Sequence, residues 1–162
     1  MNNIVAFPGI HIEPFSDKYV DACSAFLHKS WHQNYTEILP PDIVAERTQQ
    51  TFRQYLMSKQ GLCWAAFAGE RVVGLLSVSS NCVEDLWVDE KFKRRNIGSQ
   101  LLEIALQHFK QKGFQNAQVG CESFNHDLTR FLSAKGWRQI GSQPINVTPD
   151  MPVEALVFAT AL

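Results

Sequence analysis

A cluster of basic residues stands in the middle of the chain, between a predicted strand and a predicted helix. Four of the five residues 91–95 are basic, and the small residues Gly98 and Ser99 follow where the helix is expected to begin. Small residues at such a junction expose the first helical N–H groups, which form an anion site with the positive end of the helix dipole. This arrangement indicates a site for a phosphorylated cofactor. A solvated charged face, a nucleic-acid patch and a targeting tag are the alternative interpretations.

The segments on either side of the basic cluster have clear periodicity. Residues 83–88 alternate, with Leu86 and Val88 on one face and Asp85 and Trp87 on the other, as in a strand with one polar face. From Gly98 onward, apolar residues recur at steps of three and four, and Gly113 ends the run at the position of a C-terminal cap. The pattern therefore predicts a strand, a basic loop and a helix in direct succession.

The loop residues Lys93-Arg94-Arg95-Asn96-Ile97-Gly98 resemble the motif Q/R-x-x-G-x-G/A of the GCN5-related N-acetyltransferases (GNAT superfamily). In that family the motif binds the pyrophosphate of acetyl-CoA. Lys93 replaces the usual Gln or Arg, and Asn96 replaces the first Gly. Lysine still donates hydrogen bonds to phosphate, and Asn tolerates positive φ better than other non-glycine residues. The resemblance implies acetyl-CoA as co-substrate, no metal, and these cofactor-binding residues: Leu86, Trp87, Val88, Lys93, Arg94, Arg95, Asn96, Ile97, Gly98, Ser99, Asn125 and Phe131.

A second segment, closer to the C-terminus, is similar to the family pattern N-x-x-A-x-x-F-Y-x-x-x-G-F. It matches at Asn125, expected to cap a helix, at Phe131, expected to point inward, and at the pair Gly136 and Trp137. Leu132 stands where family enzymes commonly have the Tyr that protonates the leaving thiolate. Leucine cannot donate a proton, so the donor is left open among water, Cys121, Ser123 and Tyr35.

Acetyl transfer to an amine needs a neutral amine, a polarised thioester carbonyl and a proton for the departing thiolate. In family members with a similar strand before the loop, a Glu acts as general base, usually through water, which implies this role for Glu84. Asp85, on the opposite face, is the competing candidate, and Glu84 as an ordinary solvated carboxylate is the alternative. Backbone N–H groups of residues 86–88 are expected to polarise the carbonyl.

An aromatic pair precedes the second predicted helix. Trp31 and Tyr35 belong to a SW-xxx-Y-xxx-LP pattern that looks similar in one bacterial subgroup of the family. The family builds its wall for the acceptor substrate from this region, so the resemblance implies that Trp31 and Tyr35 bind the substrate. Because the two residues are four positions apart, an aromatic pair that covers the core is the alternative.

The remaining periodicity predicts an α/β (α+β) fold. Strands are expected at residues 10–15, 63–68, 71–79, 83–88, 117–121, 137–142 and 154–160, with helices at 17–28 and 42–57 and a proline-containing loop at 144–152. The resemblance implies a mixed, mostly antiparallel sheet of six or seven strands with helices on both faces. It also implies that the fourth and fifth strands splay apart to hold the pantetheine arm.

Bulk composition restricts the function classes. With 162 residues, 45% hydrophobic and 19% charged, residues 1–162 are expected to form a single domain. The net charge of -1 argues against general binding to nucleic acid or membranes. The chain lacks an apolar run of ~20 residues and the charged start of a signal peptide, which predicts a cytoplasmic protein. The cysteines lack the spacing of metal ligands and are expected to be free thiols: Cys23, Cys63, Cys82 and Cys121.

The sequence thus predicts an N-acetyltransferase that moves an acetyl group from acetyl-CoA to the primary amine of a small molecule, by direct attack in a ternary complex. A protein or peptide acetyltransferase and a non-catalytic acyl-CoA-binding module are the alternatives. A nucleoside triphosphatase is excluded because the chain has no G-x-x-x-x-G-K-[ST] motif. The expected partners are acetyl-CoA and an amine, with no nucleic acid and no membrane, and the protein is expected to be a monomer or a homodimer.

Overall fold

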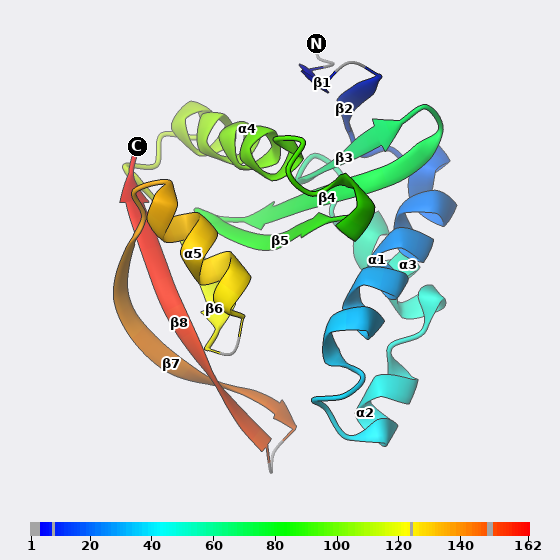
Figure 1. The fold of residues 1–162 in the computed structure, drawn as a ribbon, viewed down its shortest axis with the longest axis vertical. Helices are drawn as coiled ribbons and strands as arrows, with labels where there is room; N and C mark the ends of the chain where they lie inside the picture. Colours follow the sequence, from blue (N-terminus) through cyan, green and yellow to red (C-terminus); the bar gives the residue numbers. More distant parts are fainter. Residues whose placement is uncertain (1–3, 8, 124, 149–150) are drawn as a thin grey trace. The chain divides into compact units, whose positions relative to one another are not determined.

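The computed structural model describes residues 4–7, 9–123, 125–148 and 151–162 (Figure 1). Its strands are β1 (Ile4–Phe7), β2 (Ile10–Pro14), β3 (Cys63–Ala68), β4 (Arg71–Ser79), β5 (Cys82–Val88), β6 (Asn116–Glu122), β7 (Arg138–Thr148) and β8 (Met151–Ala161). Its α-helices are α1 (Val20–Tyr35), α2 (Pro41–Glu46), α3 (Gln49–Met57), α4 (Ile97–Gln111) and α5 (His126–Ala134). Two short 3-10 helices, η1 (Asp17–Tyr19) and η2 (Glu90–Phe92), complete the described elements. The strand order is β1-β2-β3-β4-β5-β6-β8-β7.

The chain forms two compact units, and strand β5 contributes residues to both. The first comprises Met1–Ser77 with Asp85–Ile104, and the second comprises Val78–Glu84 with Ala105–Leu162. In the first unit β2 pairs antiparallel with β3, and β3 pairs antiparallel with β4. Helices α1 and α3 lie side by side in this unit (Figure 1). Their apolar faces share a buried core with residues of β3 and β4, which includes Cys23, Leu27, Leu56, Ala65 and Leu75.

Helix α4 begins directly against strand β4, where Gly74 leaves room for it. A Cβ atom added to Gly74 would lie 3.1 Å from Ile97 Cγ2 and 3.2 Å from both Leu101 Cδ1 and Ala66 Cβ. Ile97 and Leu101 are themselves buried. The absence of a side chain at Gly74 therefore sets how closely the first turn of α4 approaches the sheet.

We expect Gly74→Val to destabilise the protein by ~1–3 kcal/mol, because the added side chain overpacks a full core. Thermal unfolding followed by circular dichroism measures the effect. Gly141→Val is the matched control, since nothing lies within 4 Å of a Cβ at Gly141 on β7. An equal loss of stability in both variants would contradict the close approach of α4 to β4.

The second unit contains a long antiparallel hairpin. Strand β8 pairs with β7 along nearly its whole length and with β6 from Ala155 to Ala161 (Figure 1). Strand β6 pairs parallel with β5 through Cys82–Gln118 and Val83–Val119. This parallel pair, and the antiparallel pairs elsewhere, confirm the predicted mixed sheet. The described residues contain the seven predicted strands and, before them, the short strand β1.

Three boundaries differ from the sequence-based prediction. The first helix does not end near residue 28: after η1, α1 continues through Trp31 to Tyr35, whose rings pack against each other in a tilted arrangement. The second predicted helix is two helices, because the Thr48 side chain accepts a hydrogen bond from Thr51 N and starts α3 anew. Most of the predicted loop 144–152 is strand, with residues 149 and 150 outside the described part. Pro144 and Pro152 lie in the part of the hairpin where β7 pairs with β8 and, among the described strand pairs, β8 is not yet paired with β6.

The expectations for Gly113 and for the four cysteines are confirmed. Gly113 has φ 87°, which suits a residue just past a helix end. Its N–H donates a hydrogen bond to Lys110 O in the last turn of α4. The four cysteines are free thiols, three of them buried. Within the described ranges, no helix has the length and hydropathy needed to cross a membrane. The predicted lack of a signal peptide concerns residues 1–8, of which 1–3 and 8 lie outside the described residues.

Candidate active site

Asp89 fixes the start of the loop between β5 and α4 through three hydrogen bonds. The backbone N–H of Asp89 donates to Val73 O on β4 at 2.8 Å. Its carboxylate accepts from Lys91 N at 2.9 Å and from Arg71 at 2.8 Å. Burial alone would raise the pKa of this carboxyl, but the two donors and the charge of Arg71 hold the pKa below its usual range. Asp89 is therefore an ionised anchor for the basic loop.

Two residues of the loop have left-handed backbone conformations. Arg94 has φ 69° and Asn96 has φ 65°, and α4 begins at the next residue, Ile97. Alternating left-handed residues turn successive N–H groups toward the same side, which creates an anion-binding concavity. The prediction that Asn96 adopts positive φ is confirmed. The same conformation at Arg94 was not predicted.

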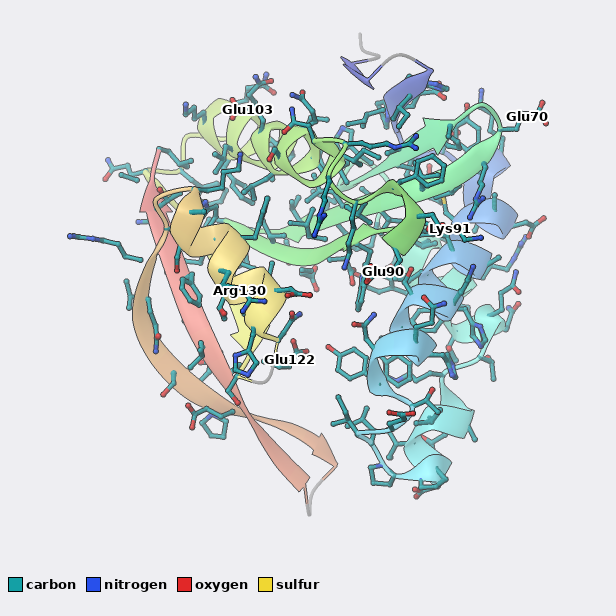
Figure 2. The ribbon with its side chains drawn as sticks, in the orientation of Figure 1. Glu70, Glu90, Lys91, Glu103, Glu122 and Arg130 are labelled. Atoms are coloured by element: carbon teal, nitrogen blue, oxygen red, sulfur yellow. The ribbon has the colours of Figure 1, made fainter. Side chains whose placement is uncertain are left out.

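The basic side chains of the loop are exposed, and several already have partners. Lys93 donates to Glu90 at 2.8 Å. The guanidinium of Arg95 lies 4.9 Å from the centre of the Phe92 ring, and that of Arg71 lies 5.4 Å from it. Figure 2 shows Glu90 and Lys91 in the segment between β5 and α4. The guanidinium groups of Arg95 and Arg71 thus both lie near the Phe92 ring, in the loop that contains the two left-handed residues.

The two neighbouring carboxylates of β5 have different surroundings. Glu84 is exposed. Asp85 is half-buried and accepts three hydrogen bonds: from Tyr55 Oη at 2.6 Å, from Ser77 Oγ at 2.6 Å and from Trp87 Nε1 at 3.1 Å. The expectation that Asp85 and Trp87 share a face is borne out by their hydrogen bond. Glu84 is accessible to solvent, whereas Asp85 belongs to a hydrogen-bond network with residues of α3 and β4.

A row of aromatic rings connects α1 with β5. The ring centres of Trp31 and Tyr35 are 5.0 Å apart, and those of Tyr35 and Trp87 are 6.5 Å apart. Trp31 also lies 6.1 Å from Phe52 on α3, and the guanidinium of Arg47 lies 5.5 Å from the Trp31 ring. Trp31 and Trp87 pack on the core with one side and are half-buried. Trp31 therefore covers the core, as the alternative interpretation held for the pair, and Tyr35 reaches Trp87 on the strand that carries the two carboxylates.

The second unit contains the other sequence-predicted residues, Asn125 and Phe131, on α5. Asn125 caps this helix by accepting from Leu128 N at 3.2 Å, as expected. The prediction that Phe131 points inward needs correction: Phe131 is half-buried, with the Lys135 ammonium 5.8 Å from its ring, and Leu132 is the fully buried residue. Burial raises the pKa of the Cys121 thiol to about 11, so it stays protonated at neutral pH.

Comparison with protein families decides the identity. Residues 32–147 match the family model of the acetyltransferase (GNAT) domain. The chain belongs to the GNAT family. No curated protein matches this GNAT chain. The predicted family and the predicted enzyme class, an acetyltransferase, are thereby confirmed.

Solved structures share the fold of this GNAT protein. PaiA N-acetyltransferase from Thermoplasma acidophilum, in complex with coenzyme A, is 17% identical with a TM-score of 0.71, covering 94% of this chain and 99% of the other. RimL, a ribosomal L7/L12 alpha-N-protein acetyltransferase in complex with coenzyme A, is 15% identical with a TM-score of 0.72, covering 99% and 98%. YncA of Salmonella typhimurium, a putative acetyltransferase with acetyl-CoA, is 15% identical with a TM-score of 0.72, covering 95% and 94%.

The structure of this GNAT protein also shows two hydrogen-bond partners of Asp85 that the sequence analysis did not name. Tyr55 and Ser77 join Asp85 through tertiary contacts between α3, β4 and β5. Nothing in the sequence indicates that Tyr55 differs in role from the other residues of the amphipathic helix α3. Ser77 carried a usable signal, because it is a polar residue in the otherwise apolar run of β4. In the described part of the chain, no three His, Cys, Asp or Glu side chains come together as metal ligands.

Proposed function

We propose that this GNAT acetyltransferase moves the acetyl group of acetyl-CoA to the primary amine of a small molecule. The observation that carries the proposal is the loop before α4, where the left-handed residues Arg94 and Asn96 occupy the motif expected to bind pyrophosphate. Of the three solved structures named above, two hold coenzyme A and one holds acetyl-CoA, which supports the same cofactor here.

The proposed reaction is a direct attack within a ternary complex. The loop and the first N–H groups of α4 bind the pyrophosphate. Asn125 and Phe131 are further proposed cofactor-binding residues. Backbone N–H groups of Leu86, Trp87 and Val88 polarise the thioester carbonyl. Glu84 accepts the proton of the acceptor ammonium through water, and its exposure lets it pass that proton to solvent.

Two aromatic residues support a small acceptor. Trp31 and Tyr35 form a wall that continues to Trp87 on β5, and flat rings of this kind hold compact organic amines. One observation favours a protein acceptor as the second candidate: RimL, which acts on a protein N-terminus, has the same fold over almost the full length of both chains.

An acceptor panel tests the proposal. Purified protein is mixed with acetyl-CoA and, in turn, diamines, polyamines, aminoglycosides, amino acids and peptides with an unblocked N-terminus, and the released thiol is measured. Turnover with a small amine at a kcat/KM at least tenfold above that of any peptide is the expected result. Preference for peptides would replace the small-molecule proposal by the second candidate. Binding of acetyl-CoA without thiol release across the whole panel would overturn catalysis.

A further inference from the structure

Arg47 is an exposed cation that helix α1 holds at two points. Its guanidinium lies 5.5 Å from the centre of the Trp31 ring, and its backbone oxygen accepts a hydrogen bond from His32 Nε2 at 2.6 Å. Arg47 lies between α2 and α3, whereas Trp31 and His32 are neighbours on α1. Both the backbone and the charged end of Arg47 are therefore positioned by the same turn of α1.

The ring beside Arg47 has a firm support of its own. Trp31 packs on the buried core of the first unit, and its ring centre lies 6.1 Å from that of Phe52 on α3. The His32 ring lies 5.1 Å from it, edge to face. A guanidinium over an aromatic ring keeps its N–H donors available, because they point outward in its own plane. Arg47 thus presents several donors and one positive charge from a defined position.

In the part of the chain that the structure describes, no carboxylate forms an ion pair with Arg47. The ion pairs there join other cations to acids, such as Arg53 of α3 to Asp21 of α1. Asp42 and Glu46 on α2 are close in sequence and exposed, but neither is among these pairs. The charge of Arg47 is therefore available to an anion from outside the chain.

A row of rings leads from Arg47 to the proposed site of the thioester. The Trp31 ring is 5.0 Å from that of Tyr35, which is 6.5 Å from that of Trp87 on β5. The backbone of Trp87 is among those proposed to polarise the thioester carbonyl. These residues all belong to the first unit. An acceptor that lies along the row has its amine at the β5 end, where attack takes place, and its other end beside Arg47.

We propose, on the basis of the function above, that Arg47 binds a carboxylate of the acceptor, so that the substrate is an amine with an anionic group at its far end. A second cation beside Trp31 would be repelled by the guanidinium, which disfavours diamines and polyamines. A carboxylate instead gains charge-assisted hydrogen bonds from the planar fork of Arg47. Arg47 takes no part in bond making: it determines which amine binds and in which direction it lies.

Three acceptors of equal length test the proposal: ε-aminocaproate, hexylamine and hexamethylenediamine. At the end far from the reacting amine they carry a negative charge, no charge and a positive charge. Initial rates with acetyl-CoA give kcat/KM for each, corrected for the two equivalent amines of the diamine. We expect wild type to prefer ε-aminocaproate to the diamine by ~10-fold or more, with hexylamine between them. Because Arg47 is exposed, this preference should shrink as the salt concentration rises.

Substitutions of Arg47 should change this preference in a set order. Arg47→Met should raise the KM for ε-aminocaproate by ~10-fold, with kcat within about twofold of wild type, because the contact is the same before and during the chemical step. Arg47→Glu should reverse the order in favour of the diamine. Arg47→Lys should keep the order at reduced strength, since the charge remains without the planar fork. Arg53→Met is the matched control, because its guanidinium is already paired with Asp21, and should leave the preference unchanged.

The outcomes separate the two proposals. The same order of the three acceptors in wild type and Arg47→Glu would leave the proposed function standing and overturn the role of Arg47. A wild-type preference for the diamine, or turnover of other acceptors with none of these three, would overturn it as well. An equal change of preference in Arg53→Met would assign the effect to surface charge in general and also overturn it. Wild type without turnover on any amine would overturn both proposals at once.

Discussion

Gly98→Asp should weaken coenzyme A binding by about 10²–10³-fold. The substitution places a side chain and a negative charge in the first turn of α4, directly after the left-handed residues Arg94 and Asn96. Phosphate oxygens that approach the first N–H groups would meet a carboxylate there. Isothermal titration calorimetry with coenzyme A gives the affinity of the wild type and of the variant.

Two control variants separate charge from position. Gly98→Ala stays within the family pattern and should bind coenzyme A within a few-fold of wild type. Gln107→Asp adds the same charge to an exposed position of the same helix and should also leave the affinity nearly unchanged. If Gly98→Asp binds coenzyme A as tightly as these controls do, the cofactor phosphates lie elsewhere. The loop would then not have the proposed role in binding pyrophosphate.

Glu84→Gln should lower kcat by about 10²-fold, because it keeps the shape of the side chain and removes the proposed base. Coenzyme A affinity should persist, since the loop is untouched. Rates measured across pH with saturating acetyl-CoA, and calorimetric titration with coenzyme A, check both parts.

Glu103→Gln serves as the control for this variant, because Glu103 is an exposed carboxylate on α4 (Figure 2). Its rate and pH profile should match those of wild type. A Glu84→Gln enzyme that retains full turnover and the wild-type pH profile would show that the ammonium proton leaves directly to bulk water or through Asp85.

Local sequence was sufficient to predict the strand, loop and helix around the basic cluster. Alternation in β5, the three-and-four spacing in α4 and the terminal Gly113 each depend on residues close in the chain. The parallel β5–β6 pair and the cap at Asn125 followed from the family pattern and are present. The roles of Glu84, Trp31 and Tyr35 remain predictions, which the variants and the acceptor panel can test.

Features that depend on distant residues could not be predicted in the same way. Tyr55, Ser77 and Asp85 are up to 30 positions apart, and only the packing of α3 on the sheet brings their oxygens together. The α2–α3 break was missed because the apolar spacing runs on through it, while the cap at Thr48 depends on one side chain. The strand ends near Pro144 and Pro152 were missed because proline usually ends strands, whereas here both residues belong to the paired β7–β8 hairpin.

The left-handed conformation of Arg94 also bears on the entropy of the unfolded chain. A non-glycine residue in this region costs of order 1 kcal/mol in the folded state. A glycine would avoid that strain but would give the unfolded loop many more backbone conformations to lose. From Lys91 to Ile97 the segment has no glycine, so it is comparatively stiff before folding as well as after it. The strain at Arg94 is thus accompanied by a smaller loss of backbone entropy when this loop folds.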